Sequence, residues 1–132
     1  GHTMQFLLLI YTDDEMLEAL PDGEFDARMN HCFRNADEMR EQGTLIDSQQ
    51  LEAASSARSV RFRNGKLSVV DGSFAETKEL LGGFNLIEAA DYEEAVRIAA
   101  SFPWTQTGCV EVRAVRDMDA VRRRVGAVVP AR

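Results

Sequence analysis

The chain has 132 residues with a formal net charge of −7, and 45% of its residues are hydrophobic. A chain of this length forms one domain with a substantial core. Its acidic balance argues against direct nucleic-acid binding, because a protein that neutralises phosphates needs a basic surface. No apolar run approaches the roughly 20 residues of a membrane-spanning helix, which argues against a membrane protein.

The cysteines and the start of the chain bear on cofactors and compartment. Cys32 and Cys109 lie far apart, and neither has a CxxC or histidine partner at a metal-binding spacing. We therefore expect no metal, no cofactor and no disulfide framework, with a reducing cytoplasm as the default location. Residues 1–3 precede Met4 and resemble a cloning scar, which leaves His31 as the histidine to consider for function.

The first third of the chain predicts a strand, a helix and a second strand. Residues 4–11 form a continuous apolar run, which predicts a strand buried on both faces. Residues 12–23 are a polar connection. Apolar residues then step by four and three through residues 24–42, which predicts a helix ending at Gly43. Residues 44–51 predict the next strand.

The middle of the chain predicts a β-hairpin. Asn64 and Gly65 separate two strand-like runs, SVRFR and KLSVVD, which is the pattern of a two-residue type I′ turn. This register pairs Arg58 with Asp71. Asp71 also lies at the end of an apolar face, by the period of two along a strand. The apolar residues that share this face are Val60, Phe62, Leu67 and Val69.

The last third predicts a strand, a helix and a strand. Residues 82–89 form a strand entered through Gly82 and Gly83, which we interpret as allowing close strand packing or a bulge. Residues 91–101 form a helix that opens with an Asp and a Glu in capping-box spacing. Residues 109–115 form the final strand.

This order of elements predicts an α+β fold. The sequence β-α-β-β-β-β-α-β is a ferredoxin-like split βαβ arrangement with an added central hairpin. Two helices cover only one face of a sheet, and the apolar first strand needs a cover on the other face. We therefore predict a homodimer in which two sheets face each other, a dimeric α/β barrel.

The C-terminal tail, residues 116–132, differs in charge from the domain that precedes it. It has five arginines and two aspartates, a charge of +3, so the rest of the chain carries −10. This basic tail is either a solvated helix end that frays or a surface for an acidic protein partner.

Several segments together resemble the YCII-related family, in its DGPF-motif branch. They are LLLIY, MNHCFRNADEM, VRFRNGKLSVVDGSFAETKELLGGFNLIEA, YEEAVRIAASFP and VEVRAV, and the resemblance covers roughly residues 4–115. Ser73 stands where the family usually has proline. The resemblance implies a ferredoxin-like dimer, a pocket holding a His and an Asp, and no settled activity. Some members lie beside genes for extracytoplasmic-function sigma factors.

The resemblance matches the family's His to His31 and its Asp to Asp71, with Glu76, Thr77 and Lys78 as the charged run. From the residues alone, His31 is either a surface histidine or a general acid or base. Asp71 has three readings. It forms a cross-strand ion pair with Arg58, it stabilises the turn, or it orients His31 as acids do in hydrolytic triads.

The candidate substrate-binding residues surround the same loop. Ser73 is a nucleophile only with a base in reach, and Phe74 is a loop anchor or a stacking platform. Glu76 and Lys78 are a solvated turn or the rim of a site for a carboxylate or other anion. Trp104 either lines a pocket mouth or caps the core. The full set is Arg58, Ser73, Phe74, Glu76 and Lys78.

Two functions follow from these residues. The first is a metal-independent enzyme of isomerase, lyase or hydrolase style, which uses a His31–Asp71 acid–base pair on a small anionic or oxygenated substrate. The second is a non-catalytic ligand-binding or regulatory module, which signals to a protein partner, in the manner of a sigma-factor system, through a tail containing residues 122–124. A purely structural dimer leaves Asp71 unexplained except through Arg58.

Overall fold

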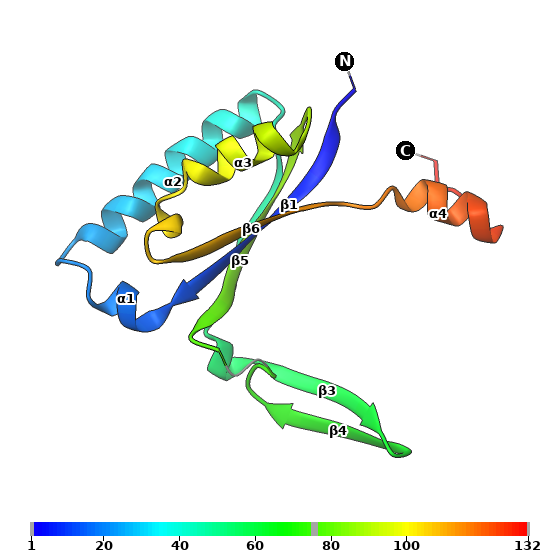
Figure 1. Cartoon of the computed structure of the whole chain (residues 1–132), viewed down its shortest axis with the longest axis horizontal. Helices are drawn as coiled ribbons and strands as arrows, with labels where there is room; N and C mark the ends of the chain where they lie inside the picture. The colour runs from blue at the N-terminus through cyan, green and yellow to red at the C-terminus, as the bar shows by residue number, and fades with distance from the viewer. Residues whose placement is uncertain (1, 75–76, 132) are drawn as a thin grey trace.

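The computed structural model of the chain describes residues 2–74 and 77–131. Its strands and helices follow the predicted order, with two short 3-10 helices between them (Figure 1). The elements are β1 (Met4–Asp13), α1 (Asp14–Glu18), α2 (Glu24–Glu41), β2 (Leu45–Gln50), η1 (Ala54–Ser56), β3 (Arg58–Arg63), β4 (Lys66–Asp71), β5 (Glu79–Ala89), α3 (Tyr92–Ala100), η2 (Pro103–Thr105), β6 (Gly108–Ala114) and α4 (Met118–Val125).

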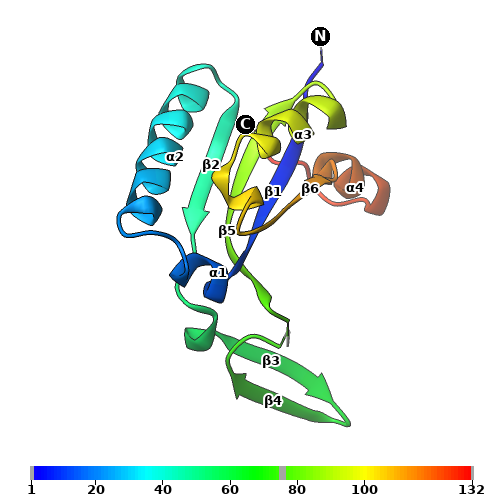
Figure 2. The same cartoon turned by 60° about the vertical axis from the view of Figure 1, so that its left-hand side comes forward.

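Four strands form an antiparallel sheet in the order β2-β5-β1-β6. The two long helices, α2 and α3, lie on the same face of this sheet (Figures 1 and 2). This is the ferredoxin-like arrangement, so the predicted fold class is confirmed. The hairpin β3–β4 forms its own two-stranded sheet and projects beyond the end of the main sheet.

The core lies between the sheet and the two helices. Phe6 and Leu8 of β1 and Ile87 of β5 are completely buried, as the period of two along a strand requires. The alternate residues of β1, Leu7 and Leu9, are only half-buried. In one chain the middle of the first strand is therefore completely buried on one face only, whereas its apolar composition predicts burial on both.

The hairpin has the predicted register. Arg58 pairs with Asp71 and Phe62 with Leu67. Asn64 and Gly65 have φ values of 51° and 74°, the left-handed conformation that a type I′ turn requires at both central residues. Its apolar face is open to solvent, because the side chains on it are 60–72% exposed: Val60, Phe62, Leu67 and Val69.

The structure adds a short helix where the sequence indicates a polar connection. The Asp13 carboxylate accepts a hydrogen bond from the Glu15 backbone N–H at 3.0 Å and so caps α1. Leu17 of this helix packs against the core. Five residues with one apolar contact leave too weak a periodic signal for detection. No helix among the described residues has the length and apolar character to cross a membrane.

The glycine pair of β5 has both roles that the sequence suggests. Gly82 has no partner in β1, because Gly83 pairs with Ile10 and Leu81 pairs with Tyr11, which is a β-bulge. At Gly83 the backbone of β2 approaches closely, since an added Cβ would lie 2.8 Å from the Gln49 carbonyl oxygen. The strand also begins at Glu79, three residues before the predicted start.

Candidate functional site

The structure pairs Asp71 with Arg58. The Arg58 Nε lies 3.1 Å from Asp71 Oδ1, and the two side chains are 58% and 85% exposed. The cross-strand ion pair that the register predicts is therefore present. It lies on the surface of the hairpin, where an ion pair contributes little to stability.

His31 lies on another element. It is an exposed residue of α2, and its side chain makes no hydrogen bond or ion pair with any other described residue. Both views place α2 and the hairpin far apart (Figures 1 and 2). Within one chain the structure does not bring His31 and Asp71 together, and their pairing in an assembled protein stays a prediction.

Three of the other candidates share a small hollow at the base of the hairpin. Arg58, Ser73 and Phe74 line about 400 Å³ of space together with residues that include 51–54 and 56–57. Phe74 is 73% exposed, and the Arg61 guanidinium lies 5.4 Å from its ring centre. Phe74 is thus a surface platform for a cation rather than a buried anchor.

Lys78, another candidate, does not line that hollow. Lys78 lies 3.8 Å from the Glu15 carboxylate, and both side chains are solvent-exposed. Glu76 falls outside the residues that the structure describes. The sequence predicts one charged rim around the loop after Asp71. In the structure Lys78 instead pairs with Glu15, while Asp71 pairs with Arg58.

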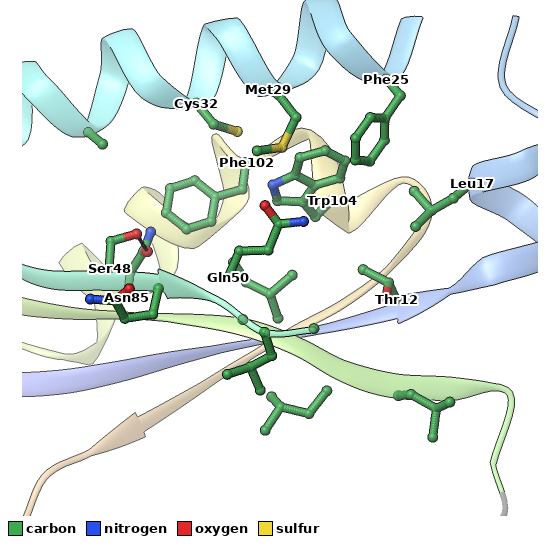
Figure 3. A pocket seen from close by; sticks show the side chains of 18 of the residues that line it. Thr12, Leu17, Phe25, Met29, Cys32, Ser48, Gln50, Asn85, Phe102 and Trp104 are labelled. Atoms are coloured by element: carbon green, nitrogen blue, oxygen red, sulfur yellow. Dashed lines mark hydrogen bonds between the residues drawn. The ribbon is translucent and has the colours of Figure 1, made fainter. Parts of the chain in front are cut away.

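A larger cavity lies between α2 and the sheet (Figure 3). Its volume is about 510 Å³, within the range of small-molecule sites in proteins. Aromatic, thioether and thiol side chains form the wall on the side of the helix α2. Amide and hydroxyl side chains form the opposite wall, on the sheet. The labelled lining residues are Thr12, Leu17, Phe25, Met29, Cys32, Ser48, Gln50, Asn85, Phe102 and Trp104.

The spacing of apolar residues on α2 builds one wall. Steps of four and three put Phe25, Met29 and Cys32 on the side that faces the sheet. Met39, near the end of the helix, is buried, whereas Phe25 at its start is 37% exposed. Burial along α2 thus increases from its beginning to its end, although both residues line the cavity.

Trp104 closes the cavity between α2 and β6. Its side chain is 7% exposed, and its ring centre lies 5.7 Å from that of Phe25. Arg28 joins η2 to α2, because it donates hydrogen bonds to the Pro103 carbonyl and to Gln106 Oε1, each at 3.2 Å. Both sequence readings of Trp104 are confirmed, since the same ring covers the core and lines the cavity.

Two paired strands supply the polar groups of the cavity floor. Ser48 of β2 lies opposite Asn85 of β5, and its hydroxyl donates a hydrogen bond to Asn85 Oδ1. Asn85 is only 8% exposed, so this amide is a fixed polar group in an apolar setting. Gln50, nearer the end of β2, directs its amide toward the Trp104 ring (Figure 3). These groups provide directional contacts for a ligand.

Cys32 is the nucleophilic side chain of the cavity. Burial raises the pKa of its thiol above the ordinary value, and a hydrogen bond with Trp104 opposes this effect. The thiol therefore remains protonated at neutral pH, which suppresses its nucleophilicity.

The charges of the cavity differ from those of the predicted anion site. Among the described lining residues there is no lysine, arginine or histidine, whereas Asp14 and Glu52 are carboxylates. Arg58 and Lys78, the cations expected at the site, do not line it. No group of three His, Cys, Asp or Glu side chains within residues 2–74 and 77–131 has a metal-binding arrangement.

The apolar stripe predicts the helix α2, and its residues do belong to the core or pack against it, but the stripe gives no sign that it also lines a cavity. The same apolar spacing serves a helix that packs on a sheet and one that stands off from it. The position of α2 involves contacts such as that of Arg28 with Pro103, which lies 75 positions later. No local pattern carries that information.

Comparison with known proteins shows the family of the chain. The sequence profile described as "YCII-related domain" matches residues 4–119. The chain is also 33% identical over 112 residues to "Uncharacterized protein R00369" of Rhizobium meliloti (strain 1021). The aligned region covers 83% of this chain and 90% of that protein. The narrower DGPF branch stays a prediction. On the profile match across most of its length, the chain belongs to the YCII-related family.

Proposed function

We propose that this protein binds a small organic molecule in the cavity between α2 and the sheet. The main support for this proposal is the composition of the cavity, in which apolar and aromatic walls face a few fixed amide and hydroxyl groups. Natural small-molecule sites have this composition, because apolar area supplies affinity and a few polar groups set orientation. His31 and Asp71 line no part of it, so the proposal does not depend on their contact.

Cys32 provides the test. The variant Cys109→Ser leaves Cys32 as the sole cysteine, which iodoacetamide alkylates as the thiolate. Because the pKa of Cys32 is raised, alkylation is measured at about pH 9 rather than at neutrality. In a screen of small organic molecules, we expect a ligand to slow alkylation and to move the indole N–H resonance of Trp104, the single tryptophan.

Two matched variants locate the binding. Ala36 lines the cavity, and Ala36→Phe fills part of it. Ala27 is an exposed residue of the same helix, and Ala27→Phe makes the same change on its outer side. We expect at least about tenfold weaker binding in Ala36→Phe and unchanged binding in Ala27→Phe. Equal affinities in both variants, or a screen without any ligand that protects Cys32, would contradict the proposal.

The second candidate function is acid–base catalysis by His31 and Asp71. It is favoured by the hairpin, whose apolar face ends at Asp71 and is 60–72% exposed in one chain. An assembly that covers this face would change the surroundings of Asp71 and would bring new groups to it. In this proposal the pair acts without a metal, in an isomerase, lyase or hydrolase style.

A regulatory role would use the basic tail. Helix α4 has Arg122, Arg123 and Arg124 in its last turn, while Met118 and Val125 are more than half exposed. We propose this helix as the contact for an acidic protein partner, and a sigma-factor system is one setting for it. Exposed apolar residues beside a cluster of arginines suit such an interface.

A further inference from the structure

The charge of the cavity narrows the class of ligand, given the proposed binding function. Asp14 opens α1 and Glu52 follows β2, and these two residues are the carboxylic acids among the described lining residues. No described cation lines the cavity to balance them. An anionic ligand would enter against two like charges, whereas a cation would be attracted.

The nearby cations are already paired with other acids. Arg58 lines the adjoining hollow together with Glu52, but it lies 3.1 Å from the Asp71 carboxylate. Arg28 contacts Glu24 at 3.1 Å and also donates hydrogen bonds to residues in and directly after η2. Lys78 lies 3.8 Å from Glu15. None of these three residues lines the cavity, and none is available there to neutralise a carboxylate or phosphate of a ligand.

The aromatic lining also suits a cation. The Phe25 and Trp104 rings meet at 47° with their centres 5.7 Å apart, so they form a corner that borders the cavity. The face of such a ring attracts an ammonium group and also packs against an apolar body. On the floor, Asn85 uses its Oδ1 to accept from Ser48, and its amide N–H groups remain as donors.

We propose that the cavity selects organic amines, in which a protonated amino group is attached to an aromatic or other apolar body, over carboxylates of the same shape. The carboxylates of Asp14 and Glu52 attract the protonated amino group. The Phe25 and Trp104 rings pack against the apolar part of the ligand. Because Asp14 and Glu52 are exposed, the preference is modest, about three- to tenfold at low salt, and it weakens as salt is added.

Three probes with one body test this selection: 2-(1-naphthyl)ethylamine, 2-(1-naphthyl)ethanol and 1-naphthylacetate. Dissociation constants are measured from the Trp104 indole N–H resonance of the full chain. We expect the amine to bind more tightly than the carboxylate. In the double variant Asp14→Asn and Glu52→Gln this ratio falls toward one, while the affinity of the alcohol is unchanged. The double variant Asp37→Asn and Glu93→Gln removes two exposed carboxylates outside the cavity and keeps the ratio.

The outcomes separate this inference from the binding function. If the carboxylate binds as tightly as the amine, or if the preference survives the cavity double variant, amine selection is overturned and the binding function stands. If none of the three probes moves the Trp104 resonance and none slows alkylation of Cys32, amine selection is overturned. The binding function is overturned with it only if the broader screen also yields no ligand.

Discussion

Asp71 is a charged residue at the end of an apolar strand face, and in the structure it has an ion-pair partner. Its ion pair with Arg58 explains a carboxylate at this position without any catalytic role. Both side chains are mostly solvent-exposed, so water and salt screen their attraction. The ion pair therefore sets the surroundings of Asp71 in one chain but provides little stability.

We expect Asp71→Asn to lower the free energy of unfolding by less than about 1 kcal/mol, the usual size of an exposed ion pair. Urea unfolding measures this change in the free energy of unfolding. The variant Arg58→Gln, which removes the other partner of the ion pair, is the matched control. A cost well above that of Arg58→Gln would indicate a further partner for Asp71.

The same variant tests the acid–base proposal. If His31 and Asp71 meet in the assembled protein, Asp71→Asn displaces the imidazole resonances of His31, and Arg58→Gln displaces them less. His2 lies in the N-terminal segment and serves as an internal reference. Unchanged His31 resonances in Asp71→Asn would remove the pair from consideration.

At the scale of elements, strong local signals were sufficient for most of the fold. Asn64 and Gly65 together with alternating apolar residues determined the register of the hairpin, because only one pairing fits a two-residue turn. Asp91 caps α3 by accepting from the Glu94 N–H at 2.9 Å, as its spacing predicts. The cavity could not be predicted, because it results from the placement of α2 relative to η2.

The glycine pair of β5 gives a contrast between neighbours. A Cβ at Gly83 would lie 2.8 Å from a backbone oxygen of β2, which moves only if the strand moves. A Cβ at Gly82 would lie 3.2 Å from Thr12 Oγ1, a side-chain atom that a rotamer change displaces. The two positions therefore differ in how the structure absorbs one methyl group.

We expect Gly83→Ala to destabilise the protein by about 1–3 kcal/mol, as overpacking usually does, and Gly82→Ala to cost distinctly less. Urea unfolding of the two variants provides the comparison. Because Gly83 also lines the cavity, a shift of β2 should weaken ligand binding in Gly83→Ala. Equal stability losses would show that β2 yields as easily as the Thr12 side chain.

At the scale of the whole molecule, apolar surface is distributed unevenly. Helices α2 and α3 cover one face of the sheet, while Leu7, Leu9 and Tyr11 on the opposite face are only partly buried (Figure 1). The hairpin adds a second exposed apolar face. Contiguous apolar surface of this kind on a small protein usually marks an interface. The predicted homodimer would cover the sheet face with its own copy, as a closed symmetric assembly does.

We expect the protein to have twice the mass of one chain in solution, as measured by light scattering or sedimentation. Leu9→Arg places a charge at the centre of the open sheet face and should shift the equilibrium to monomer, because a buried unpaired charge is costly. Val96→Arg makes a similar change at a half-exposed position of α3, on the helical side, and should remain dimeric. Circular dichroism establishes that each variant is folded.

A folded Leu9→Arg protein that stays dimeric would contradict an interface on the open sheet face. The exposed apolar face of the hairpin would then be the surface to which the second copy binds, and Phe62→Asp would test it.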